Sequence, residues 1–137
     1  MYKHILLAVD GSENSFRAAQ DAVKIASEES LIEIISVLST EGITSEAVKA
    51  GTLDNLEAEY RQKFAREENH IKENHSNYKV TISHGSAGRM ISNYANDKNV
   101  DLVVIGCRGL NPMLEMVFGS VSTYVSKNAN CSTLLVK

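Results

Sequence analysis

The chain has 137 residues, of which 43% are hydrophobic, so we expect one domain over residues 1–137 with a substantial core. Its 14 basic and 17 acidic residues give a formal net charge of −3, which argues against a nucleic-acid partner because no cationic face is available for phosphates. The first apolar run ends at Asp10 and is too short for a signal peptide or a membrane span, so we expect a cytoplasmic protein without membrane association.

The first third of the chain is predicted to form a strand, a helix and a second strand. Residues 5–9 are a continuous apolar run, which is typical of a strand buried on both faces of a parallel sheet. A helix follows, because apolar residues recur at helical spacing from Phe16 to Ala26 after N-cap residues that begin at Ser12. Residues 31–38 are the second strand candidate.

A loop and a long charged helix are predicted next. Residues 39–52 contain two glycines among small and polar side chains, and we expect them to form the longest loop. Apolar residues from Leu53 to Ile71 then recur at helical spacing, which predicts one long helix. Its charged runs, including residues 66–68, are interpreted as a solvent-exposed face with local ion pairs.

The second half alternates strands and helices in the same way. Strands are predicted at residues 79–83, 102–105 and 133–136, with one helix after the Gly85-Ser86 turn and another that begins near Val121. This strict alternation predicts a single-domain, doubly wound, Rossmann-like α/β fold. Its five parallel strands are expected in the order 3-2-1-4-5, with helices on both faces.

Glycine-bearing loops follow the first and fourth predicted strands. In such a sheet a ligand binds beyond the carboxyl ends of the strands where their order reverses, which here is between these two strands. Residues 106–120 contain the spacing G-x2-G-x9-G-S, in which glycine lets a phosphate approach peptide N–H groups and Ser120 adds a hydroxyl donor at a helix start. The pattern indicates a phosphate site, although glycines used only as turns would give the same spacing.

With these features the chain resembles the ATP-binding branch of the universal stress protein family along essentially its whole length. The resemblance is carried by residues 5–12, the strand through Val37, the Gly85-Ser86 turn, residues 101–106 and the G-x2-G-x9-G-S motif. It implies that ATP, or AMP or ADP, binds in the crevice between the first and fourth predicted strands and that the protein is a homodimer. It also implies a role in stress survival rather than catalysis of one defined metabolic reaction.

The resemblance also assigns candidate contacts to individual residues. Asp10 would meet the ribose or a Mg²⁺ or Mn²⁺ ion that bridges the phosphates, Val37 would offer its backbone to the adenine, and the glycine motif would bind sugar and phosphates. The complete set of candidate residues is Ala8, Val9, Asp10, Ser12, Val37, Ile105, Gly106, Arg108, Gly109, Gly119, Ser120, Val121 and Ser122.

Some of these residues have a simpler interpretation. Asp10 could instead cap the helix that follows it, and Arg108 could be a solvated loop residue. Cys107 stands where the family often has Ser or Thr, and it is either a small turn residue or a redox-sensitive thiol. Ser132 stands where the family often has Pro after Cys. The four histidines and two cysteines have no metal-binding spacing.

The same residues argue against three other functional classes. The sequence has no G-x-x-x-x-G-K-[ST] loop, which excludes the usual P-loop ATPase chemistry and leaves at most slow ATP hydrolysis. A response-regulator receiver needs an acidic cluster after the first strand and an aspartate after the third, where this chain has only Asp10 and His84. The first loop is too short for a flavin carrier. A dimeric scaffold without a nucleotide stays open as the alternative.

The last predicted strand bears on assembly. Residues 133–136 would lie at the edge of the sheet and are apolar and free of proline. An edge of this kind pairs readily with another strand, so we expect a homodimer formed through the C-terminal strand across a two-fold axis.

Overall fold

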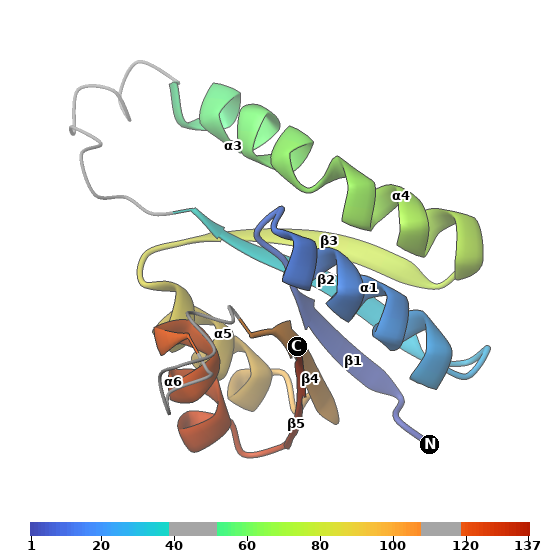
Figure 1. Ribbon diagram of the computed structural model, residues 1–137. Coiled ribbons are helices and arrows are strands. Elements are labelled where there is room, and N and C mark those ends of the chain that lie inside the picture. Colours follow the sequence, from blue (N-terminus) through green and yellow to red (C-terminus); the bar gives the residue numbers. More distant parts are fainter. Residues whose placement is uncertain (39–51, 108–118) are drawn as a thin grey trace.

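Five parallel strands with helices on both sides make up the computed structural model of the protein, which describes residues 1–38, 52–107 and 119–137 (Figure 1). The strand order is β3-β2-β1-β4-β5, which confirms the predicted fold class and order. The strands are β1 (His4–Ala8), β2 (Leu31–Leu38), β3 (Tyr78–His84), β4 (Leu102–Gly106) and β5 (Ser132–Val136). The helices are α1 (Glu13–Ile25), α3 (Thr52–Lys63), α4 (Ala65–Asn74), α5 (Ala87–Asp97) and α6 (Ser120–Asn128).

The central strand β1 is buried on both faces, as its continuous apolar run predicts. Ile5 and Leu7 pack in one core cluster with residues of α1 and α4. Leu6 and Ala8 face the other way and pack with residues of α5 and α6. Alternate residues of one apolar strand therefore hold together the two helical layers visible in Figure 1.

The prediction of one long helix from Leu53 to Ile71 is wrong in one respect, because the structure has two helices there. Phe64 separates α3 from α4 with a non-helical φ of −114° and ψ of 25°. Its side chain is 1% exposed and packs in the same core cluster as Ile71. The bend directs the aromatic ring into the core and lets α4 pack along α1. Residues 39–51 of the predicted loop lie outside the described residues, and Thr52 already begins α3.

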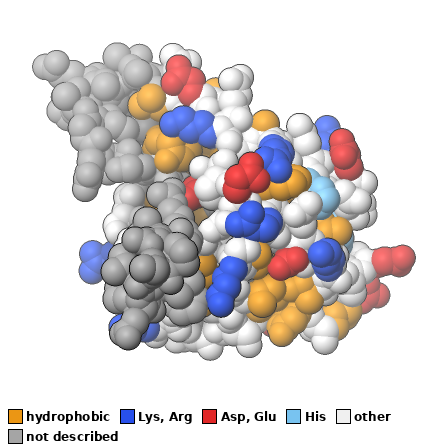
Figure 2. Space-filling model, viewed as in Figure 1, with side chains coloured by type: hydrophobic (Ala, Val, Ile, Leu, Met, Phe, Trp, Pro, Cys, Tyr) orange, Lys and Arg blue, Asp and Glu red, His pale blue; other side chains and the backbone are white. Residues whose placement is uncertain are grey.

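The charged face predicted for this region is confirmed only in part. Figure 2 shows basic and acidic side chains interspersed on the surface, and ion pairs join Arg61 to Glu68 (2.6 Å) and Arg66 to Glu13 (2.8 Å). Glu67, in the middle of the run, is instead 1% exposed. It turns inward because its position on α4 faces α1 and the loop after β1.

A second buried carboxylate, Glu33, lies within the sheet on β2. It is fully buried and accepts hydrogen bonds from His4 Nε2 (2.8 Å), Thr81 Oγ1 (2.6 Å) and the Tyr94 hydroxyl, while Lys79 Nζ lies 3.7 Å away. Burial by itself raises the pKa of Glu33, but the three hydrogen bonds and the Lys79 charge outweigh it and hold the pKa below its usual value.

Within the described ranges, no helix has both the length and the apolar character that crossing a lipid bilayer requires.

Candidate functional site

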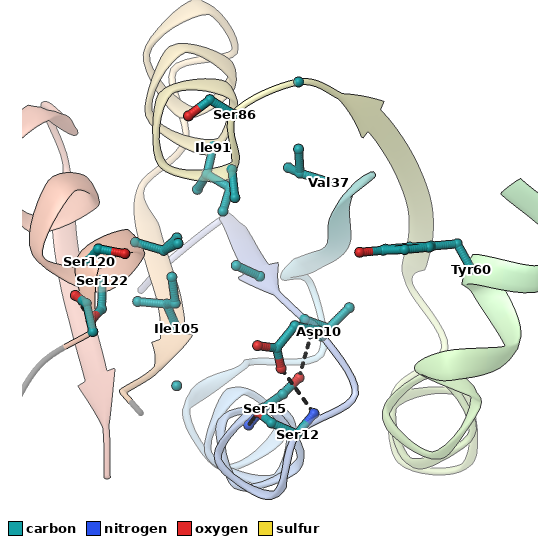
Figure 3. Close-up of a pocket in the computed structure, with 17 residues that line it drawn as sticks. Asp10, Ser12, Ser15, Val37, Tyr60, Ser86, Ile91, Ile105, Ser120 and Ser122 are labelled. Atoms are coloured by element: carbon teal, nitrogen blue, oxygen red, sulfur yellow. Dashed lines mark hydrogen bonds between the residues drawn. The ribbon is translucent and has the colours of Figure 1, made fainter. Parts of the chain in front are cut away.

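A cavity of about 560 Å³ lies at the carboxyl ends of the strands, where the strand order reverses (Figure 3). Its walls come from the loop after β1, the end of β2, the turn before α5, the end of β4 and the start of α6, with one side chain from α3. The lining residues are Ala8, Val9, Asp10, Ser12, Ser15, Val37, Tyr60, Gly85, Ser86, Ala87, Ile91, Ile105, Gly106, Gly119, Ser120, Val121 and Ser122.

The cavity gathers the residues that the sequence analysis selected. All of them line it except Arg108 and Gly109, which lie outside the described residues. The structure therefore brings together residues from positions 8–12, 37, 105–106 and 119–122 of the chain. The individual contacts assigned to them stay predictions.

The loop after β1 has a tightly determined shape. Gly11 has a φ of +83°, which favours glycine, and a Cβ there would lie 2.5 Å from the backbone oxygen of Lys63. Ser12 is the N-cap of α1, since its Oγ accepts a hydrogen bond from the Ser15 backbone N–H at 3.1 Å. Asp10 Oδ1 accepts from the Ser12 N–H at 2.9 Å. The helix cap proposed as the alternative role of Asp10 thus belongs to Ser12.

The glycine at the end of β4 is explained by packing. A Cβ on Gly106 would lie 2.6 Å from the backbone carbon and oxygen of Asn14 and 2.9 Å from the backbone nitrogen of Ser15. The strand end and the start of α1 are therefore too close for any side chain at this position. This reason differs from the phosphate approach that the spacing suggested, and it brings the loops after β1 and β4 together.

The start of α6 faces the cavity with donor groups. Gly119 is the N-cap and has no side chain that could accept from the first peptide N–H groups of the helix. Ser120 is exposed and its side chain points toward the cavity (Figure 3). Ser122 is 2% exposed, and its Oγ donates to the Gly119 carbonyl at 3.0 Å. A helix N-terminus of this form attracts anions through its first N–H groups, which have no partner within the helix, and through its dipole.

The opposite part of the cavity is more apolar, and most of it was missed by the sequence analysis. Val37 was predicted, but Ala87, Ile91 and the ring of Tyr60 were not assigned to a site. In Figure 3 the Tyr60 ring extends from α3 with its hydroxyl toward the space near Val37 and Asp10. The pattern gave no signal for Tyr60, because α3 is distant in sequence and its apolar positions are explained equally well by a core.

Two further unpredicted residues have clear local reasons. Gly85 has a φ of +128° and turns the chain from β3 into α5, and Ser86 is the N-cap of α5. The Gly85-Ser86 turn was visible in the sequence at the carboxyl end of a predicted strand, and that position is the signal that could have placed it in the site. Ser15, which also lines the cavity, was not assigned to the site.

Cys107 follows β4 and is buried, with an exposed fraction of 1%. Burial raises the pKa of the Cys107 thiol above its ordinary value, against a smaller opposing effect of a hydrogen bond with Ser122. A thiol with a raised pKa is a poor nucleophile at neutral pH, so the structure favours the small turn residue over the redox-sensitive thiol.

Comparison with known proteins identifies the family. The model of the universal stress protein family matches residues 1–137. This chain belongs to the universal stress protein family. The universal stress protein YxiE of Bacillus subtilis is 29% identical over 148 residues, which cover 100% of both chains. The solved structure of universal stress protein UspA from Lactobacillus plantarum has a TM-score of 0.80 and 25% identity over 99% of this chain and 98% of that one.

Two other solved structures of family members carry adenine nucleotides. A universal stress protein in complex with cAMP has a TM-score of 0.71 and 20% identity, and covers 99% of this chain and 97% of its own. The universal stress protein from Archaeoglobus fulgidus in complex with dAMP has a TM-score of 0.71 and 18% identity, and covers 99% of this chain and 98% of its own. At identities of 20% and 18%, these two structures show that this chain has the same fold.

Proposed function

We propose that this universal stress protein binds ATP or another adenine nucleotide as a regulator of the stress response in the cytoplasm. The observation that carries the proposal is the start of α6, where the glycine N-cap and Ser120 face a cavity of about 560 Å³ whose other end is apolar. A nucleotide combines the same two chemistries in one molecule, because its base is flat and largely apolar and its phosphates are anionic. The adenine nucleotides in two structural relatives support this choice.

The proposed orientation follows from the two ends of the cavity. The adenine lies beside Val37 and Ile91, and the ribose lies near Asp10. The phosphates accept hydrogen bonds from the peptide N–H groups of α6 and from Ser120. Arg108 and Gly109, outside the described residues, are proposed to complete the phosphate end.

A divalent cation fits this arrangement only together with the phosphates. Among the described residues, no group of three or more His, Cys, Asp or Glu side chains is placed to hold a metal ion. Mg²⁺ is commonly held by one or two carboxylates plus substrate phosphates, and Asp10 is the carboxylate that lines the cavity. Mg²⁺ or Mn²⁺ would there neutralise phosphate charge.

Binding, rather than rapid catalysis, is the activity that these residues support. Asp10 and Tyr60 are the ionisable side chains among the described residues that line the cavity. Asp10 already accepts a hydrogen bond from the loop, which suits a ligand contact better than proton transfer. We therefore propose at most slow hydrolysis of ATP.

Assembly as a homodimer is proposed from the edge strand β5. It pairs with β4 on one side and forms one edge of the sheet, and Leu134 is 36% exposed there. Pairing of β5 with a second copy would cover this edge. A dimeric scaffold that works without a nucleotide is the alternative function.

The proposal is tested first by mass analysis of small molecules released from purified protein that was never supplemented with nucleotide. Release of ATP, ADP or AMP is expected. Calorimetry then compares ATP binding by the wild type and by Gly119→Val, because a branched side chain at the N-cap would occupy the place of a phosphate. The variant should keep its circular dichroism spectrum and lose ATP binding. Unchanged affinity in the folded variant contradicts the proposed phosphate position.

A further inference from the structure

The buried carboxyl group of Glu67 is not explained by the residues that line the cavity. Glu67 lies on α4 and is 1% exposed. Burying a carboxyl group is costly unless hydrogen bonds replace those lost to water, and an apolar residue at this position would avoid the cost. Its contacts therefore indicate what the carboxyl group does.

One contact of Glu67 reaches the cavity through Ser15. The Ser15 hydroxyl donates to Glu67 Oε2 at 3.3 Å and accepts from the Asp10 backbone N–H at 3.0 Å. A serine hydroxyl has one hydrogen, so donation to the carboxyl directs a lone pair toward the Asp10 N–H. Glu67 thus orients the Ser15 hydroxyl so that it accepts the hydrogen bond from the Asp10 N–H. Ser15 is itself only 3% exposed.

The next residue of the loop acts on the same carboxyl group electrostatically. Burial raises the pKa of Glu67, and the Ser15 hydrogen bond and the Gly11 backbone partly offset that rise. The same loop is closed by the bond from the Ser12 N–H to Asp10 Oδ1, which Figure 3 shows beside the Asp10–Ser15 bond. The carboxyl group on α4 therefore reaches the Asp10 peptide N–H through the Ser15 hydroxyl.

We infer that Glu67 is a positioning residue of the nucleotide site, which holds the loop of residues 10–12 in its binding conformation through Ser15. The inference rests on the proposed nucleotide binding. A loop ordered before the ligand arrives loses less conformational entropy on binding, so the contribution of Glu67 appears in affinity although the side chain does not touch the ligand.

Three variants of α4 test this role by calorimetry with ATP. Glu67→Met keeps the length of the side chain but removes the acceptor, and it should raise the Kd about 10-fold or more. Glu67→Gln keeps an oxygen that accepts from Ser15, and its Kd should stay within about 3-fold of the wild type. Glu73→Met removes an exposed carboxylate from the same helix and should leave the Kd unchanged.

Ser15→Ala and amide exchange separate positioning from general stability. Because Glu67 acts through Ser15, Ser15→Ala should raise the Kd by itself, and adding Glu67→Met should raise it less than the two single effects combined. By nuclear magnetic resonance, the Asp10 amide should exchange faster in either variant while amides of β4 keep their wild-type rates. Ser15→Ala also carries the test if Glu67→Met does not fold.

The outcomes distinguish the two levels of the proposal. If the wild type binds ATP and folded Glu67→Met binds it with the same Kd, the positioning role is refuted and the nucleotide site stands. Unchanged exchange of the Asp10 amide likewise refutes the positioning role. If the wild type does not bind ATP at all, the proposed function and the inference both fail.

Discussion

Replacing Glu33 by Gln should lower the stability of the protein markedly, although it exchanges only one carboxylate oxygen for an NH₂ group. In the wild type, Oε1 accepts from His4 and lies near Lys79, while Oε2 accepts from Thr81 and Tyr94. An amide keeps only one of the two carboxylate oxygens, so the groups paired with the other oxygen lose a charged acceptor and must reorient to accept from the NH₂ group or lose their bond. Losing a buried hydrogen bond to a charged group costs about 1.5–3 kcal/mol, and we expect the free energy of unfolding to fall by this amount.

The destabilisation should depend on pH with a definite sign. The pKa of Glu33 in the folded protein lies below 4.5, its ordinary value and its expected value in the unfolded chain. A lowered pKa stabilises the fold above the unfolded value, and this contribution disappears as the pH falls through the folded value. The difference in stability between wild type and Glu33→Gln should therefore be full at neutral pH and shrink under acid conditions.

Urea denaturation followed by far-ultraviolet circular dichroism measures both effects. Glu73→Gln, an exposed carboxylate, is the control and should change the free energy of unfolding by less than about 0.5 kcal/mol. A Glu33→Gln variant as stable as the wild type at neutral pH would refute the reasoning. So would a loss of stability that does not diminish on acidification.

Three further changes test the site and the assembly. Gly106→Ala should lower the free energy of unfolding by about 1–3 kcal/mol, because its Cβ meets the backbone of Asn14, and wild-type stability in urea would contradict this. Arg108→Ala should weaken the binding of ATP by about 1.5–3 kcal/mol in calorimetry and the binding of adenosine much less. Equal weakening of both ligands would exclude a phosphate contact. Leu135→Pro should convert a dimer to a monomer in sedimentation, and a wild type that is monomeric with and without ATP would refute pairing through β5.

Most of the fold could be predicted because its signals are local. The apolar runs of β1 and β4 identify buried strands, and the polar residues after β1 identify the start of α1. Alternation of strands and helices then leaves few arrangements, and it places the ligand where the strand order reverses. The location of the candidate site was therefore predicted from the loops that leave β1 and β4, and its individual residues came from the family resemblance.

The missed features depend on contacts between distant parts of the chain. Helical spacing continues through Phe64, so only the burial of its ring against other elements reveals the break. Charged residues are usually exposed, and the sequence around Glu33 and Glu67 does not identify the groups that could pair with a buried carboxylate. Their partners are far away: Ser15 lies 52 residues from Glu67, and Tyr94 lies 61 residues from Glu33.

The bend at Phe64 divides this part of the chain into two regions with different freedom to evolve. On α4, Ile71 is buried in the core and Glu67 is buried where it bonds to Ser15, so substitutions there disturb the packing or the loop after β1. On α3, Tyr60 reaches the cavity, and the described side chains of the helix, at residues 55–63, belong to neither core cluster. Relatives can therefore change the wall of the cavity through α3 without repacking the interior. We expect sequences in the family to diverge more along α3 than along α4, and ligand preference to diverge with them.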